Sequence, residues 1–244
     1  ASKMLNIKIF LFEPNLVLGR SNKFFIGSCQ KIFCYSDNIK NFPTGFKDKI
    51  SIIPALLRKN FYNIVKYNGG SKNFNLLIIG GSQGAKLFDT VIQNSIIALS
   101  KKYKLKIFHQ TGKNNFENLK LFYQTNDIES ELFDYNDDVA IFMSKANICL
   151  TRAGASTLAE LVFLCIPHLV IPLPTAKDNH QYENALFFNQ HGCNWILNQN
   201  EINDNNLTNK LFNIIEHKEE YLNKKINMKN FSYQNTWNNI NQKI

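Results

Sequence analysis

Short apolar runs separated by turn-forming residues open the chain. Three of them have the character of β-strands, at residues 6–12, 31–35 and 49–53. The alternation of apolar runs and turns then ends, and residues 61–74 contain an Asn-Gly-Gly-Ser sequence that is typical of a connecting segment. We therefore predict a first unit at residues 1–60 and a linker at residues 61–74.

A stronger pattern follows the linker, in which apolar runs alternate with helical stretches of roughly ten to fifteen residues. The runs expected to form strands lie at residues 73–79, 105–112, 130–135, 147–152, 167–174 and 193–197. This alternation indicates βαβ units and a parallel sheet, so the predicted fold class is α/β. Ligands of such sheets bind beyond the carboxyl ends of the strands, so the turns at those ends are the candidate sites.

Composition adds limits on size and compartment. The chain has 244 residues, 44% of them hydrophobic, which is enough for one large core or two modest ones. It opens with a strand pattern and without an initiator methionine or a signal-type segment, so we expect a preceding segment to be missing. The five cysteines form no Cys-x-x-Cys pair, which favours a reducing compartment over a disulfide framework or a structural zinc site.

The net charge of +9 at pH 7 favours partners such as phosphates, nucleic acid or an anionic membrane surface. A composition rich in Lys, Asn, Ile and Phe, as AT-rich genomes produce, explains the charge equally well. No apolar run approaches the roughly 20 residues that cross a bilayer. Charge alone therefore selects no partner.

A glycine turn, Gly-Gly-Ser-Gln-Gly-Ala at residues 80–85, follows one predicted strand and opens a helix. Gly80 and Gly81 permit close approach of a ligand, and the amides at a helix start favour an anion. The turn is neither a Walker loop nor a complete dinucleotide fingerprint. A tight connection with Ser82 as N-cap is an equal alternative.

A second small-residue turn lies in Thr-Arg-Ala-Gly-Ala-Ser-Thr-Leu-Ala-Glu, residues 151–160. Ser156 or Thr157 is expected to cap the following helix, and Glu160 is placed where the helix dipole favours a carboxylate. The functional alternative is that Glu160 accepts hydrogen bonds from the vicinal hydroxyls of a ribose. Two such turns at successive strand ends suit a nucleotide sugar.

A third polar segment, residues 172–185, brings Asp178, His180, Gln181 and Asn184 to the start of a helix. Amides and an imidazole presented together suit a ligand with several hydroxyls, hence a sugar. The structural alternatives are Asp178 as N-cap and His180 as an ordinary surface residue.

Five ordered segments carry a family resemblance. They are Gly-Gly-Ser-Gln-Gly-Ala (80–85), His-Gln-Thr-Gly-Lys (109–113), Asp-Tyr-Asn-Asp-Asp-Val (134–139), residues 151–160 and Asp-Asn-His-Gln-Tyr-Glu-Asn-Ala (178–185). In order and spacing the chain resembles the MurG family of glycosyltransferases, and residues 12–23 resemble that family's His-Glu-Gln-Asn segment. The fold implied is GT-B, with two Rossmann-like domains and parallel sheets, the first domain truncated.

The resemblance implies four parts of the chain. Residues 1–60 are the end of the acceptor-binding domain, residues 61–74 the linker, residues 75–228 the UDP-sugar donor domain and residues 229–244 a C-terminal helix.

The resemblance also implies donor contacts. Arg58 and Ser82 meet the diphosphate, Glu160 the ribose hydroxyls, and Asn136 the uracil through its backbone. The backbone lining the nucleotide is that of Ala155, Ser156, Thr157, Leu158, Ala159 and Glu160.

The transferred sugar and the acceptor involve other residues. Gln181, with His180 beside it, is implied to bind the sugar hydroxyls. Asn15 and Glu13 are implied to lie in the interdomain cleft, near the acceptor diphosphate and the sugar. Phe12 and Pro14 replace the family's His and Gln around Glu13, and residues 54–58 also depart from the family pattern. These departures concern the acceptor side, whereas the donor side is nearly intact.

The implied reaction transfers N-acetylglucosamine from UDP-N-acetylglucosamine to an undecaprenyl-diphosphate-linked N-acetylmuramoyl-pentapeptide, with inversion at the anomeric carbon. It needs no metal and no cofactor, and the general base is expected in the missing N-terminal segment, so this chain alone is expected to catalyse poorly. The acceptor implies a peripheral location on the cytoplasmic face of the inner membrane, with the basic charge facing anionic lipid and no role in binding nucleic acid.

Two alternatives stay open. One is another GT-B enzyme that uses a UDP-sugar, such as a diacylglycerol glycosyltransferase or a UDP-sugar epimerase. The other is a non-catalytic UDP-sugar-binding module. A nucleic-acid binder ranks third, because no recognised motif accompanies the charge.

Overall fold

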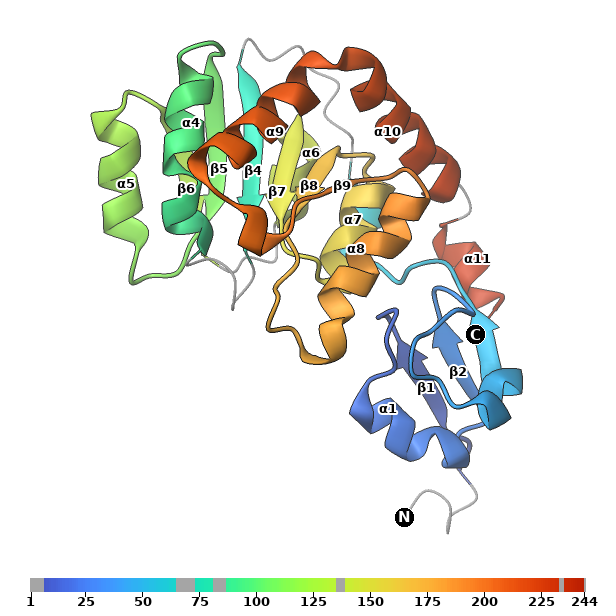
Figure 1. Cartoon of the computed structure of the whole chain (residues 1–244). Helices are drawn as coiled ribbons and strands as arrows, with labels where there is room; N and C mark the ends of the chain where they lie inside the picture. The colour runs from blue at the N-terminus through green and yellow to red at the C-terminus, as the bar shows by residue number, and fades with distance from the viewer. Residues whose placement is uncertain (1–6, 65–72, 81–86, 135–138, 233–234, 244) are drawn as a thin grey trace.

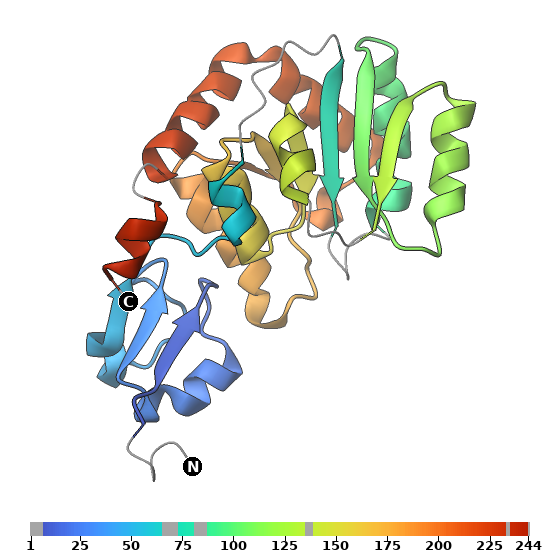
Figure 2. The same cartoon turned by 180° about the vertical axis from the view of Figure 1, so that it is seen from behind.

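The computed structural model describes residues 7–64, 73–80, 87–134, 139–232 and 235–243. Its strands form two separate parallel sheets, one of three strands and one of six, and both views place the smaller sheet at one end of the molecule (Figures 1 and 2). The predicted α/β class with parallel sheets is confirmed.

The first sheet contains β1 (Phe10–Glu13), β2 (Lys31–Cys34) and β3 (Ile50–Ile52), in that spatial order. Between the strands lie α1 (Arg20–Phe25) and the short 3-10 helices η1 (Ile26–Ser28) and η2 (Thr44–Lys49), and α2 (Lys59–Tyr62) follows β3. Ile32 and Cys34 of β2 point into a small core shared with Leu16, Leu18 and Ile26. The predicted strand at residues 6–12 is displaced toward the C-terminus, because β1 begins at Phe10.

The second sheet has the order β6-β5-β4-β7-β8-β9. Its strands are β4 (Phe74–Ile79), β5 (Leu105–Gln110), β6 (Glu129–Phe133), β7 (Ile148–Thr151), β8 (His168–Val170) and β9 (Trp195–Ile196). The helices packed around it include α4 (Gln93–Ser100), α5 (Phe116–Thr125), α6 (Val139–Lys145), α7 (Ala155–Phe163), α8 (His180–Gln190) and α9 (Asp204–Glu216).

Alternate residues of each strand feed two different cores, as the pleat of a strand requires. Leu76 and Ile78 of β4 pack in a cluster with residues of α4, α5 and α9, whereas Leu77 and Ile79 pack with residues of α6, α7 and α8. A sheet covered on both faces explains why these strands read as continuous apolar runs.

Neighbouring strands β4 and β7 mark the point where the strand order reverses. From β4 the chain proceeds through β5 to β6 on one side, then returns to β7 and proceeds to β9 on the other. The carboxyl ends of β4 and β7 therefore lie side by side, with Ile79 in register with Thr151. This is the switch point at which open parallel sheets bind ligands.

The C-terminal segment returns to the first sheet. After α10 (Lys218–Ser232), Asn235 donates to the backbone oxygen of Ala55 at 2.9 Å, and α11 (Trp237–Asn241) lies beside the first sheet (Figure 1). The predicted domain boundaries after residues 60 and 228 fall inside α2 and α10. The division of the chain into four parts stays a prediction. Within the described ranges, no helix has both the length and the apolar character needed to cross a bilayer.

Candidate functional site

The turn after β7 forms the described centre of the candidate site. Gly80 ends the described part of the chain after β4, and Arg152–Gly154 form the turn between β7 and α7. Ser82 and Asn136 lie outside the described residues, so their predicted contacts with diphosphate and uracil stay predictions.

Helix α7 begins without a side-chain cap. Gly154 is its N-cap residue, and glycine has no side chain with which to cap the first-turn amides. The expectation that Ser156 or Thr157 caps this helix is therefore wrong, because the first helical residue is already Ala155 and the cap position is occupied by a residue without a side chain. The amides that open an α-helix have no partner within it, so they are available to an anion.

The predicted nucleotide-lining stretch divides by exposure. Leu158 and Ala159 are buried in the core that also contains residues of α6 and α8, and Ala155 is buried at the turn. Ser156 is exposed and Thr157 half-buried. A ligand can therefore meet the side chains of Ser156 and Thr157 and the backbone of the turn.

Gly154 is not required by the fold. Its φ of −66° and ψ of 129° are accessible to any residue. A Cβ added at this position would meet Thr157 Oγ1 at 3.6 Å, which is ordinary van der Waals contact. The described neighbours of Gly154 would therefore accommodate a methyl group at this position.

Glu160 pairs with Arg58 instead of with the helix dipole. It is the sixth residue of α7, beyond the first turn where the dipole acts, and it is 3% exposed. Arg58 Nε donates to Oε1 at 2.8 Å and Nη2 donates to Oε2 at 3.1 Å. Burial raises the pKa of Glu160, and the Arg58 guanidinium opposes that rise. The structure thus joins two residues that were predicted to hold different parts of the donor.

Gln181 and His180 begin α8, next to the same turn. Gln181 Oε1 accepts hydrogen bonds from the backbone amides of Ala153 (3.2 Å) and Leu173 (3.0 Å), so its Nε2 group is the part left for a ligand. His180 is half-buried and its Nδ1 lies 2.8 Å from the oxygen of Lys177. Because a carbonyl only accepts, the proton lies on Nδ1 in the neutral ring, and Nε2 is an acceptor.

The start of α8 differs from the expectation for Asp178. The N-cap residue is Asn179, without a side-chain cap bond, and both Asp178 (φ 53°) and Asn179 (φ 56°) adopt left-handed conformations. Asp and Asn are the residues that tolerate this region best after glycine. Asp178 therefore shapes the loop through its backbone and does not cap the helix.

Asn184, on the same helix, was grouped by sequence with the side chains that suit a sugar ligand but was given no separate role. It is fully buried and donates from Nδ2 to Asn15 Oδ1 (3.0 Å) and to the oxygen of Ala153 (3.1 Å). Its Oδ1 accepts from the amide of Leu16 at 2.9 Å. The signal was present in the sequence, because Asn184 follows His180 by four residues and Gln181 by three, which puts all three on one helical face.

Glu13 is turned inward. Its carboxylate is 2% exposed and accepts bonds from the amide and the side chain of Asn15 (both 3.1 Å), from the amide of Gly19 (2.7 Å) and from Asn22 (2.9 Å). These bonds shape the loop between β1 and α1. A direct contact between Glu13 and a ligand requires some of them to be exchanged, whereas Asn15 lies at the junction with α8.

A buried polar cluster braces the segment after β5. Asp89 accepts from Thr111 Oγ1 (3.1 Å) and Asn115 Nδ2 (2.6 Å), and its other oxygen lies 3.4 Å from His109 Nε2. Burial favours a higher pKa for Asp89, but His109, Asn115 and Thr111 together lower it below its ordinary value. His109 is fully buried, with Nδ1 2.7 Å from Tyr123 Oη, and burial lowers its pKa. The His-Gln-Thr-Gly-Lys motif therefore contributes a structural histidine.

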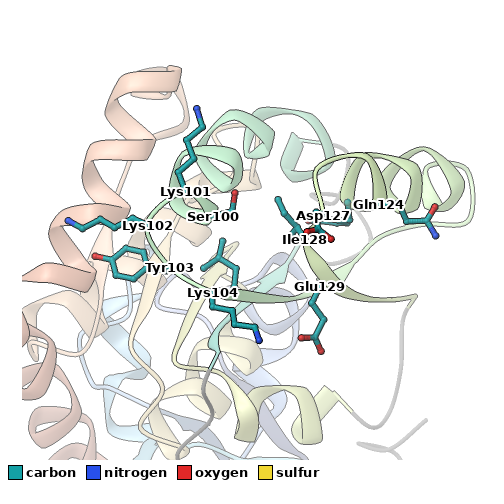
Figure 3. A pocket seen from close by; sticks show the side chains of 11 residues that line it. Ser100, Lys101, Lys102, Tyr103, Lys104, Gln124, Asp127, Ile128 and Glu129 are labelled. Atoms are coloured by element: carbon teal, nitrogen blue, oxygen red, sulfur yellow. The ribbon is translucent and has the colours of Figure 1, made fainter.

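A broad surface hollow lies at the opposite edge of the sheet. It is lined by residues between Ser100 and Leu105 and between Tyr123 and Glu129, at the amino ends of β5 and β6 (Figure 3). Among its lysines, Lys102 is paired with Glu216 at 2.5 Å. Parallel sheets bind ligands at the carboxyl edge, so this hollow is not the candidate site. Among the described residues, no group of three or more His, Cys, Asp and Glu side chains is arranged to hold a metal ion.

Comparison with known proteins agrees with the sequence motifs. The glycosyltransferase family 28 C-terminal domain matches residues 75–239. A UDP-N-acetylglucosamine–N-acetylmuramyl-(pentapeptide) pyrophosphoryl-undecaprenol N-acetylglucosamine transferase of Pelagibacter ubique is 65% identical over 243 residues, which cover 100% of this chain and 68% of that protein. A transferase of the same name from Rickettsia canadensis is 39% identical over 220 residues, 88% of this chain and 62% of that protein.

A solved structure supports the fold. MurG of Acinetobacter baumannii has a TM-score of 0.73 and 24% sequence identity, and the match covers 94% of this chain and 64% of that one. The chain therefore spans about two thirds of the length of these relatives.

Proposed function

The chain belongs to the MurG family of glycosyltransferases, and on this premise we propose that it carries the donor half of an enzyme that transfers N-acetylglucosamine from UDP-N-acetylglucosamine to a lipid-linked N-acetylmuramoyl-pentapeptide. The observation that carries the proposal is the site at the reversal of strand order. There, a turn with a glycine at the N-cap position of α7, Gly154, stands beside a buried carboxylate, Glu160, whose counter-charge is the partly exposed guanidinium of Arg58.

The diphosphate and the ribose of UDP each have a complementary group in this proposal. The open amides at the start of α7 and the Arg58 guanidinium receive the negative diphosphate. The Glu160 carboxylate accepts hydrogen bonds from the ribose hydroxyls. Because Arg58 and Glu160 contact each other in the structure described here, donor binding exchanges their mutual bonds for bonds to diphosphate and ribose.

The same groups assist the reaction. As the acceptor hydroxyl attacks the anomeric carbon, negative charge develops on the leaving UDP diphosphate. Fixed amide dipoles and a guanidinium at that position stabilise this charge without reorganising at the moment of reaction. Attack from the side opposite the diphosphate gives inversion.

The proposed acceptor is lipid-linked, which requires the enzyme to work at a membrane surface. Helix α1 offers a candidate contact, since Phe24 is 81% exposed and Phe25 is 49% exposed, and Arg20 and Lys23 on the same short helix are exposed as well. An exposed aromatic pair beside cations suits the interface of an anionic leaflet. We place the enzyme peripherally, at the cytoplasmic face of the inner membrane.

Calorimetric titration of this chain with UDP-N-acetylglucosamine, UDP-glucose and GDP tests the proposal. We expect saturable binding of both UDP-sugars, tighter for the N-acetyl sugar, and no binding of GDP. Correctly folded protein that binds neither UDP-sugar would contradict the proposal. Equal binding of the two UDP-sugars would favour another enzyme of the same fold.

A further inference from the structure

A small cavity lies where the first sheet, helices α7 and α8 and the C-terminal segment meet, and we call it the junction cavity. Its volume is about 190 Å³. One wall is formed by Tyr35, which follows β2, and by residues 52–55, at the end of β3 and just after it. Other walls include Val162 of α7, Phe187 of α8 and Lys243 after α11. No residue of the turn after β7 lines the junction cavity, so it is separate from the candidate site described above.

Most of the junction cavity is lined by hydrocarbon. The ring of Phe231 packs edge-on to the rings of Phe187 and Phe188, with centroids 5.8 and 5.6 Å apart. Val162 is 1% exposed, whereas Ile52 is 47% exposed, so the cavity is open to solvent on the side of Ile52. Apolar cavities of about 150 Å³ bind benzene. The volume of the junction cavity therefore suits one aromatic ring with a small substituent.

The polar groups of the junction cavity favour a negative charge on its ligand. The Tyr35 hydroxyl accepts a hydrogen bond from the amide of Leu56 at 3.1 Å and can also donate its own proton. Burial raises the pKa of Tyr35, so the hydroxyl keeps that proton at neutral pH. Lys243 adds an ammonium group on an exposed side chain. Among the described residues that line the cavity there is no carboxylate to balance this charge.

The buried amide side chain in the same wall, that of Asn235, is already engaged within the chain. Its Oδ1 accepts from Tyr62 Oη at 3.1 Å, and its Nδ2 donates to the oxygen of Ala55 at 2.9 Å. Tyr35 and Lys243 are therefore better placed than Asn235 to hold the polar end of a ligand.

We propose that the junction cavity is a binding site for a small aromatic carboxylate, whose ring lies among the apolar walls and whose carboxylate is held by Tyr35 and Lys243. Because the walls come from the first sheet, from α7 and α8 and from the C-terminal segment, such a ligand contacts all three parts. It stabilises the arrangement in which they are joined, as any ligand stabilises the state that binds it. Neither the UDP-sugar nor the acceptor of the proposed function is needed for this binding.

Three probes separate the contribution of the ring from that of the charge, and saturation-transfer NMR of the whole chain measures their binding. Benzamide has the shape of benzoate without its charge, and acetate has the charge without the ring. We expect benzoate to reach half-saturation near about 1 mM and benzamide to bind about fivefold more weakly. Acetate should show no saturable binding. Absence of benzoate binding, or acetate binding as tight as that of benzoate, would overturn the inference.

Lys243→Gln tests the polar end of the site. It should weaken benzoate binding about threefold and leave benzamide binding unchanged, because only the charged ligand loses a partner. The matched control is Lys101→Gln, which removes the same charge from an exposed lysine in the hollow at the opposite edge of the second sheet. The control should change neither affinity. Equal weakening of benzoate binding in both variants would contradict the assignment, since net charge alone would then explain the attraction.

Ala55→Leu tests the apolar end, because the larger side chain occupies part of the junction cavity from a half-buried position in its wall. Benzoate and benzamide should both bind at least about tenfold more weakly, and circular dichroism establishes that the variant is folded. Unchanged benzoate binding by folded Ala55→Leu would show that the ligand lies elsewhere. Lys243→Gln alters an exposed side chain, so it decides the question if Ala55→Leu does not fold.

Discussion

Glu160 is a buried carboxylate whose charge is balanced by a residue 102 positions earlier in the chain. A buried ion pair costs desolvation energy that its mutual attraction only partly offsets, so its presence is weak evidence for a purely stabilising role. A pair with one accessible member can exchange partners, and the side chain of Arg58 is 37% exposed whereas that of Glu160 is 4% exposed. This asymmetry is what an exchange upon donor binding requires.

The substitution Gly154→Ala distinguishes an effect on stability from an effect on ligand affinity. The backbone angles at Gly154 suit alanine, and the gain from reduced freedom of the unfolded chain opposes the poorer N-cap preference of alanine, so we expect stability within about 1 kcal/mol of the wild type. The added methyl group takes space above the turn, and we expect about a tenfold loss of affinity for UDP-N-acetylglucosamine. Thermal unfolding and calorimetry measure the two effects.

Gly45→Ala is the control for that substitution, since no atom lies within 4 Å of a Cβ added there and Gly45 belongs to η2 of the first unit. It should leave the affinity unchanged. Unchanged affinity in Gly154→Ala as well would mean that no ligand occupies the space above the turn.

The buried side chain of His168, which is not part of the candidate site, is expected to make the stability of the fold depend on pH. It is fully buried, and burial lowers its pKa from 6.5 to about 4, although a bond with the oxygen of Ile166 partly opposes this. Between these two pH values the unfolded chain binds a proton that the folded chain does not. The free energy of unfolding should therefore fall by up to about 3 kcal/mol as the pH falls from 6.5 to 4.

Urea unfolding at a series of pH values checks this, with His168→Asn as the comparison. The variant should lose the part of the pH slope that corresponds to one proton. An identical slope in both proteins would show that His168 is not the group responsible.

At the scale of elements, the alternation of strands and helices in the second sheet was predictable because its inner strands are buried on both faces and read as apolar runs. The edge strand β6 is more exposed and more polar. The first strand was placed too early, because Ile7 continues the apolar pattern although it is 57% exposed and precedes β1. The last two residues of helix α2, 61 and 62, were assigned to the predicted linker. It forms because Phe61 is fully buried against the core of the second sheet, a long-range contact that local sequence does not reveal.

The candidate site was partly predictable for the same reasons. The turn after β7 and the start of α8 are local features, and their small and polar residues indicated them. The pairing of Arg58 with Glu160 and the bonds of Asn184 with Asn15 depend on how distant segments pack, so no spacing rule predicts them. The helix-dipole alternative for Glu160 assumed that the acid lies near the first turn of α7, but the sequence did not specify where this helix begins.

Helix α1 is expected to contribute to membrane binding. Replacing both Phe24 and Phe25 by alanine should lower binding to vesicles of phosphatidylglycerol and phosphatidylethanolamine at least about tenfold, because each exposed ring loses its burial in the interface. Cosedimentation measures the effect. Leu121→Ala, which alters a 63% exposed residue on α5, is the control and should bind as the wild type does. If the double variant sediments like the wild type, α1 is not a membrane contact.

At the scale of the whole molecule, side-chain contacts tie the first sheet and the segment after it to the second sheet and the C-terminal segment. They include Asn184 with Asn15 and Leu16, Arg58 with Glu160, Lys40 with Glu183, and Asn235 with Ala55 and Tyr62. Two of these contacts, at Asn184 and at Glu160, lie beside the turn after β7. We therefore expect occupation of the site to affect how the two parts are held together.

The central claim is that the turn after β7 receives a UDP-sugar and that Glu160 holds its ribose. The most direct test titrates the wild-type chain and Glu160→Ala with UDP and with 2′-deoxy-UDP, after circular dichroism has established that both proteins are folded. We predict that loss of the 2′-hydroxyl weakens binding about tenfold in the wild type and less than about twofold in the variant, because the variant has no carboxylate to lose. The same loss in both proteins would contradict the account, since the hydroxyl would then have another partner.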